Sequence, residues 1–150
     1  MDSGKISSEL LSLASRRLDI FRELVRLAEE QRAILVEGRH GDLLDNVRKN
    51  ESLLLTLNQV EKHEQALVEL LRDAGNEHGY RPAYRHLNQQ VLEVAGQLRD
   101  LVSVNRELLE NAAEYIRYSV SVLSEAVSDS SVGLDSDRRN CPTLLIDRKA

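Results

Sequence analysis

Apolar residues recur three and four positions apart over most of this chain, and that spacing constrains its fold more than any other feature. It occurs in three runs, at residues 6 to 37, 43 to 74 and 82 to 127. The spacing is that of an α-helix, since a half-buried strand would alternate at every second residue. The first run carries two neighbouring lines of apolar side chains, a width typical of a bundle helix that contacts two others. The sequence therefore predicts an all-α fold of long amphipathic helices.

Breaks that contain glycine or proline separate the three runs. Gly38 and Gly41 end the first run, because glycine adopts left-handed backbone angles without a steric penalty. Asp42 is placed to accept hydrogen bonds from the first free amides of the second helix. The second run stops at a loop, residues 75 to 79, and Pro82 suits the first turn of the third helix. Because the first connection is short, we predict an antiparallel three-helix bundle with coiled-coil-like seams.

The third run contains one glycine, Gly96, which falls far from either end of the predicted helix. A glycine at such a position costs about 1 kcal/mol of helix stability relative to alanine. We therefore interpret Gly96 as the mark of a close approach between helices, with a mild bend as the alternative.

The composition changes after residue 127 to serine, aspartate and glycine without an apolar period. Residues 128 to 150 cannot bury enough apolar surface to offset the entropy of ordering, so we predict a flexible tail after a bundle of residues 1 to 127. Leu144, Leu145 and Ile146 form a short apolar motif in this tail. We expect the motif to dock intermittently on the third helix and shield it, the alternative being that it is disordered or binds another protein.

Charge, aromatic content and cysteine content argue against several classes of function. The net charge is -5, and arginines are interleaved with acidic residues, so no basic face is available to displace counterions from a nucleic acid. A single cysteine, Cys141, forms no intramolecular disulfide. The N-terminus lacks the features of a signal peptide, and no apolar run approaches the roughly 20 residues that span a bilayer. The sequence predicts a soluble, cytoplasmic protein.

The residues of the sequence do not combine into a catalytic, metal or cofactor site. Glu37 and His40 have the spacing of a di-iron ligand pair, but that motif must occur twice, and Gly38 ends the helix between them. His63 lies in a polar stretch of the second helix, and we interpret it as solvated. The sequence has neither a phosphate-binding glycine loop nor a nucleophile elbow. A four-helix enzyme or phosphotransfer domain with a phosphate-accepting His63 stays as a weaker alternative.

The end of the third run is the candidate binding site. About 46 residues make a helix of about 69 Å, against about 48 Å for each of the other two, so its last turns should have little to pack on. Residues 112 to 127 hold only three charges, and two apolar seams coincide there. Such a face either is core or accepts an amphipathic helix from a partner. The predicted site comprises Leu109, Ala112, Tyr115, Ile116, Ser119, Val120 and Leu123.

At the same place the sequence resembles a known family. The stretch from Leu101 to Tyr118, LVSVNRELLENAAEYIRY, is similar to the late-helix signature of FlgN-type flagellar export chaperones. In that signature a leucine and asparagine run leads into a tyrosine-isoleucine pair. The order of the helices, the Gly41-Asp42 break and the end of the tail are also similar, so the resemblance spans nearly the whole chain.

The resemblance implies a bacterial type III secretion chaperone. Such a chaperone keeps hook-filament junction proteins soluble by binding the amphipathic helices at their C-termini, and it delivers this cargo to the cytoplasmic domain of the export gate. Tyr115 and Tyr118 match the exposed late-helix tyrosine that docking on the gate implies. The alternative, from a different class, is a structural, spectrin-like spacer that pairs with itself. A chaperone that dimerises when free should exchange these self-contacts for cargo, whereas a spacer should not.

Overall fold

The computed structural model describes residues 2 to 76 and 78 to 130. In chain order the elements are α1 (Ser3–Glu37), a short 3-10 helix η1 (His40–Asp42), α2 (Leu43–Asp73) and α3 (Arg81–Ser130). These ranges contain no β-strand, and the predicted all-α fold is confirmed. α3 continues a few residues past 127, where the predicted bundle ends. The remainder of the predicted tail, including Leu144, Leu145 and Ile146, lies outside the described residues.

The chain divides after Arg106 into two units, and each is described by itself. The first unit holds α1, η1, α2 and the part of α3 that ends at Arg106. The second unit begins at Glu107, and its described part is the rest of α3 to Ser130. The candidate binding residues all belong to the second unit, whereas the buried core belongs to the first.

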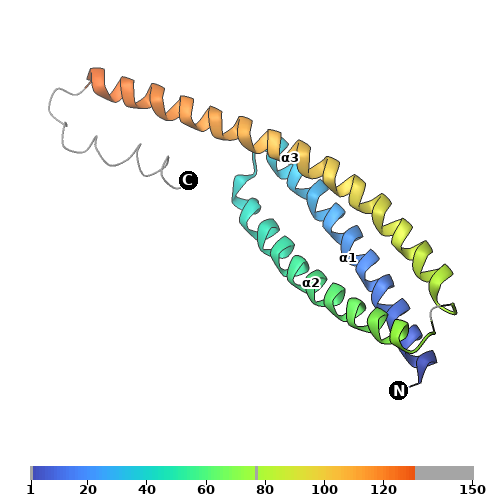
Figure 1. Ribbon diagram of the computed structural model, residues 1–150. Helices are drawn as coiled ribbons and strands as arrows, with labels where there is room; N and C mark the ends of the chain where they lie inside the picture. The colour runs from blue at the N-terminus through green and yellow to red at the C-terminus, as the bar shows by residue number, and fades with distance from the viewer. Residues whose placement is uncertain (1, 77, 131–150) are drawn as a thin grey trace. The chain divides into compact units, whose positions relative to one another are not determined.

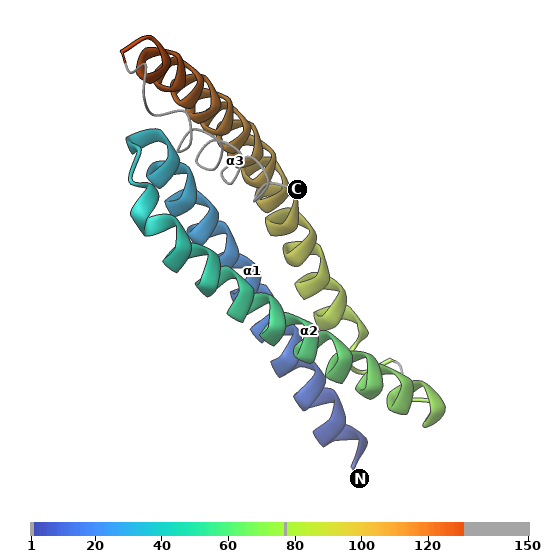
Figure 2. The ribbon, with the colours of Figure 1, turned by 90° about the vertical axis from the view of Figure 1, so that its left-hand side faces the viewer.

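In the first unit the three helices lie side by side and reverse direction at each connection. Figures 1 and 2 both show α1 in blue and α2 in green running along one another. Their backbones approach closely along the pair. The first part of α3, in yellow-green, returns along them after the loop that follows α2 (Figure 1). The predicted antiparallel three-helix arrangement is confirmed for this unit.

Two clusters of buried apolar side chains form the core of the first unit. The cluster near the loop between α2 and α3 contains Ile6, Leu10, Leu67, Leu71 and Tyr80. The other cluster contains Ile20, Leu24, Leu57 and Val60, and Leu98 of α3 packs against it. Full burial of one leucine side chain contributes about 1.5–3 kcal/mol to the free energy of folding, so these two clusters supply much of the stability of the unit.

The connection between α1 and α2 agrees with the sequence prediction at one residue and departs from it at another. Gly38 has a φ of 71°, and its N–H donates to the Ile34 carbonyl, so it ends α1 as predicted. Asp42 does not cap α2, because its side chain accepts no amide hydrogen bond from that helix. Its backbone is already helical, and its carboxylate instead accepts a hydrogen bond of 2.8 Å from Arg39.

Gly96 is not a point of close helix approach, and that interpretation was wrong. A methyl group added at its Cα would meet no atom within 4 Å. α3 runs without interruption through this position. The spacing of apolar residues predicts a helix that includes Gly96. This spacing does not show which side chains, if any, lie opposite the glycine.

We expect Gly96→Ala to raise the free energy of unfolding by about 0.5–1 kcal/mol, because alanine loses less backbone entropy in a helix and fits the open space. Urea unfolding followed by circular dichroism measures the change. Gly38→Ala is the matched control, since its positive φ penalises a side chain, and it should lower stability by about 1 kcal/mol. A neutral or destabilising Gly96→Ala would contradict the open environment.

Candidate helix-binding surface on α3

All of the predicted binding residues lie on α3 in the second unit, and most of their side chains are exposed. Ile116 is 49% exposed and Leu123 is 64% exposed, which is far from core burial. Leu109 and Tyr115 are also exposed, whereas Ala112, Ser119 and Val120 are half-buried. The helix therefore presents large apolar side chains at positions where a buried core helix would hide them.

The predicted residues share one side of the helix with several that the prediction omitted. Positions three, four and seven apart on a helix lie on one face. Val122 and Val127 follow the same period and are 45% and 50% exposed. We call the whole set the α3 stripe: Leu109, Ala112, Ala113, Tyr115, Ile116, Ser119, Val120, Val122, Leu123, Ala126 and Val127. The two valines carried the same periodic signal and could have been included from the sequence.

The two tyrosines predicted to dock on the export gate lie next to each other but differ in their position relative to the stripe. Tyr115 is 72% exposed and Tyr118 is 69% exposed, and the three-residue spacing makes them neighbours on the helix surface. Tyr115 lies at the edge of the α3 stripe. Tyr118 lies beyond this edge, toward the charged side that carries Glu114 and Arg117. A partner that covers the stripe would therefore leave Tyr118 accessible.

In the first unit, a buried ionic cluster joins all three helices, and the sequence analysis did not identify it. Glu64 of α2 is 2% exposed, and its Oε2 atom lies 3.2 Å from Nη1 of Arg17 on α1. The hydroxyl of Tyr84 on α3 donates to the same oxygen at 3.3 Å. Arg17 also donates to the side-chain carbonyl of Asn88 on α3. These contacts hold α3 against the α1–α2 pair.

Burial raises the pKa of the Glu64 carboxyl, and the nearby Arg17 charge and Tyr84 hydroxyl offset only part of this rise. A carboxyl whose pKa is raised in the folded state adds stability below its unfolded pKa of about 4.3, and this contribution is lost as pH increases through the folded pKa. Glu64→Gln removes the titration. We therefore expect the wild type to lose stability relative to this variant as pH rises above about 4.3, measured by urea unfolding. A constant difference across this range would contradict the raised pKa.

Three side-chain amides form a second buried connection between the helices. Asn105 of α3, 1% exposed, donates through Nδ2 to the Ala28 carbonyl at 2.9 Å and to Oε1 of Gln31 at 3.1 Å. Gln31 donates to Oδ1 of Asn46 on α2 at 3.4 Å, and Asn46 donates to the Leu27 carbonyl at 2.9 Å. Asn105 lies in the stretch that resembles the family signature, and the sequence gives no sign of these partners.

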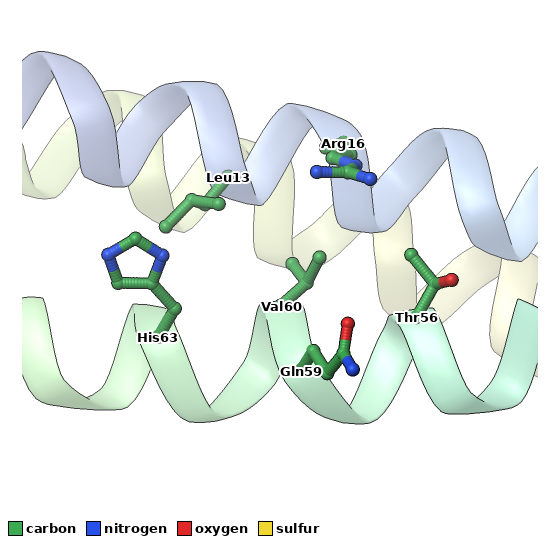
Figure 3. A pocket seen from close by; sticks show the side chains of 6 residues that line it. All are labelled: Leu13, Arg16, Thr56, Gln59, Val60 and His63. Atoms are coloured by element: carbon green, nitrogen blue, oxygen red, sulfur yellow. The ribbon is translucent and has the colours of Figure 1, made fainter.

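The remaining candidates for chemistry are surface features. Nε2 of His63 lies 3.2 Å from Oε1 of Glu9, and both side chains are partly exposed. A shallow recess of about 200 Å³ beside His63 is lined by Leu13, Arg16, Thr56, Gln59 and Val60. Figure 3 shows these side chains on the facing surfaces of α1 and α2. Among the described residues, no group of three or more histidine, cysteine, aspartate or glutamate side chains is placed to hold a metal ion.

Exposed apolar side chains along one side of a helix form a surface on which an amphipathic helix of another protein can pack. The FlgN protein family model matches residues 1 to 133 of this chain. The chain belongs to the FlgN family, whose members are flagellar export chaperones, and the resemblance found in the sequence is confirmed. Searches among curated proteins and among solved structures found no match. In the described part of the chain, no helix has the length and hydropathy of a membrane span.

Proposed function

We propose that this chaperone acts in the cytoplasm and binds the C-terminal amphipathic helices of hook-filament junction proteins on the α3 stripe. The observation that supports this most is the exposure of Ile116, Leu123 and Val127 on one side of α3. When an amphipathic partner helix packs on these residues, its apolar face and their side chains are both buried from water. Such binding keeps a cargo segment soluble before export without any chemical step.

The test is a calorimetric titration of the full-length chaperone with a purified hook-filament junction protein. A matched junction protein that lacks its C-terminal helical segment is the control. We expect saturable binding to the intact protein and none to the shortened one. Sedimentation of the free chaperone and of the mixture distinguishes the spacer alternative. A stable chaperone dimer that persists unchanged when the junction protein is added would contradict the proposed function.

We also propose that Tyr118 contacts the cytoplasmic domain of the export gate while cargo occupies the stripe. Its exposed ring lies beyond the edge of the apolar face, so a gate domain can reach it in the loaded chaperone. Tyr118→Ala should weaken binding to the purified gate domain about tenfold or more, as expected for a central aromatic contact, and leave cargo binding unchanged.

Tyr115→Ala is the comparison variant for this prediction. Because Tyr115 belongs to the stripe edge, its loss should weaken the binding of cargo as well as of the gate. Surface plasmon resonance with immobilised gate domain, and with immobilised junction protein, measures the two affinities separately. Full gate binding by Tyr118→Ala would contradict the assignment.

A further inference from the structure

The α3 stripe is wider than one partner helix needs. Val120 and Val122 are two positions apart, so they point about 160° away from each other around the helix axis. Other apolar residues of the stripe fill the arc between them, while Ser121 points to the polar side of the helix. A helix that packs along a single neighbour needs only a narrow seam, whereas contact with two neighbours requires a wider apolar arc.

Large apolar side chains are exposed near both edges of this arc in the second unit, and Val120 itself is half-buried. On one edge, Tyr115 is 72% exposed and Val122 is 45% exposed. On the other edge, Leu109 is 39% exposed and Val127 is 50% exposed. Ile116, between the edges, is also about half exposed. The apolar arc covers only part of the helix surface, because the polar side of the same segment carries charged residues: Glu110, Glu114, Arg117 and Glu125.

In the first unit, one side of α3 contacts both of the other helices. Asn105 donates hydrogen bonds to Ala28 and Gln31 of α1, whereas Tyr84 donates to Glu64 of α2. Leu98 packs against the cluster that both of these helices form. One side of α3 is thus covered there by a pair of helices that lie side by side.

We infer that the partner of the α3 stripe is likewise a pair of helices packed side by side, which completes a second three-helix bundle with residues 107 to 127. The inference rests on the proposed function and adds the shape of the cargo. A hook-filament junction protein bound here contributes two helices, one along the Val120 edge and one along the Val122 edge. A single amphipathic helix would leave one edge in contact with water.

Three consecutive residues allow a direct test, because they share one helical turn and point in different directions. Val120→Asp and Val122→Asp place a charge at opposite edges of the stripe, and Ser121→Asp places the same charge on the polar side. Calorimetric titration of each full-length variant with a purified hook-filament junction protein gives the affinities. We expect each valine variant to bind about tenfold more weakly or worse, and Ser121→Asp to bind as the wild type does. Val120→Ala and Val122→Ala, which keep the helix intact, should show smaller losses in the same sense.

Other outcomes would overturn the inference in distinguishable ways. Weakening at only one of the two valines would indicate that a single helix covers one edge. Sedimentation of the complex gives its stoichiometry, and two chaperones per junction protein would mean that a second copy of this chain supplies the second helix. If wild type and valine variants bind equally well, the chaperone function holds but its site lies elsewhere. If no chaperone binds the junction protein, the proposed function fails and this inference fails with it.

Discussion

Binding of a hook-filament junction protein is expected to be lost when Ile116 and Val120 are both replaced by aspartate. Both residues belong to the α3 stripe, and Ile116 is 49% exposed in the free protein. In the complex, each aspartate would be buried against apolar side chains without a partner for its charge. Such burial costs several kcal/mol, and each 1.4 kcal/mol is a factor of ten, so the affinity should fall about 100-fold or more.

The control variant is Arg117→Gln/Ser121→Asp, which makes the same change in net charge on the polar side of the helix. It should bind the junction protein as the wild type does. Helical content should be nearly unchanged in both variants, because aspartate, valine and isoleucine differ little in helix propensity. Calorimetry and circular dichroism measure the two properties. A large loss of helical signal in the aspartate variant would show that Ile116 and Val120 are core residues, and would remove the α3 stripe as a binding site.

Glu64→Ala is expected to lower the free energy of unfolding by about 3 kcal/mol, because it leaves the Arg17 guanidinium without its buried counter-charge. The side chain of Glu64 is 3% exposed and that of Arg17 is 16% exposed, so water can replace the lost carboxylate only in part. The hydroxyl of Tyr84 loses its acceptor in the same variant. Urea unfolding at neutral pH measures the loss.

A double variant separates the cost of an unpaired charge from a requirement for the pair itself. Arg17→Met/Glu64→Leu removes both charges and keeps most of the buried volume. Because buried ion pairs often contribute no more than apolar residues of similar size, its stability should return close to that of the wild type. If the double variant is as unstable as Glu64→Ala, the loss comes from packing or from Tyr84 rather than from the charge of Arg17.

The helices themselves could be predicted from the sequence because their signal repeats many times. The apolar period extends over dozens of residues in each helix, so an error at one position does not move the element. The prediction that Gly38 ends α1 was correct for a local reason, because the left-handed φ of this glycine does not depend on contacts with the rest of the chain. The family could also be predicted, since its late-helix signature stands in the sequence as a contiguous stretch.

The errors concern residues whose role depends on what lies opposite them. Asp42 has the right residue type and position for a helix cap, but Arg39 competes for its carboxylate. Gly96 was assigned a close neighbour that the structure does not contain. Arg17 and Glu64 are far apart in the chain, and charged residues of this kind are common on solvated helix faces. No periodic pattern distinguishes the two that meet inside the bundle.

The amides of Asn105, Gln31 and Asn46 fix the position of α3 along its two neighbouring helices. A shift of α3 by one turn, about 5.4 Å, would separate Asn105 from both of its acceptors and leave buried amide groups unpaired. The apolar seam alone would tolerate such a shift, because leucine and valine recur at similar spacing. The hydrogen bonds of these amides therefore fix the axial position of the helix up to Asn105. Sliding of α3 along the first unit would therefore require these buried hydrogen bonds to break.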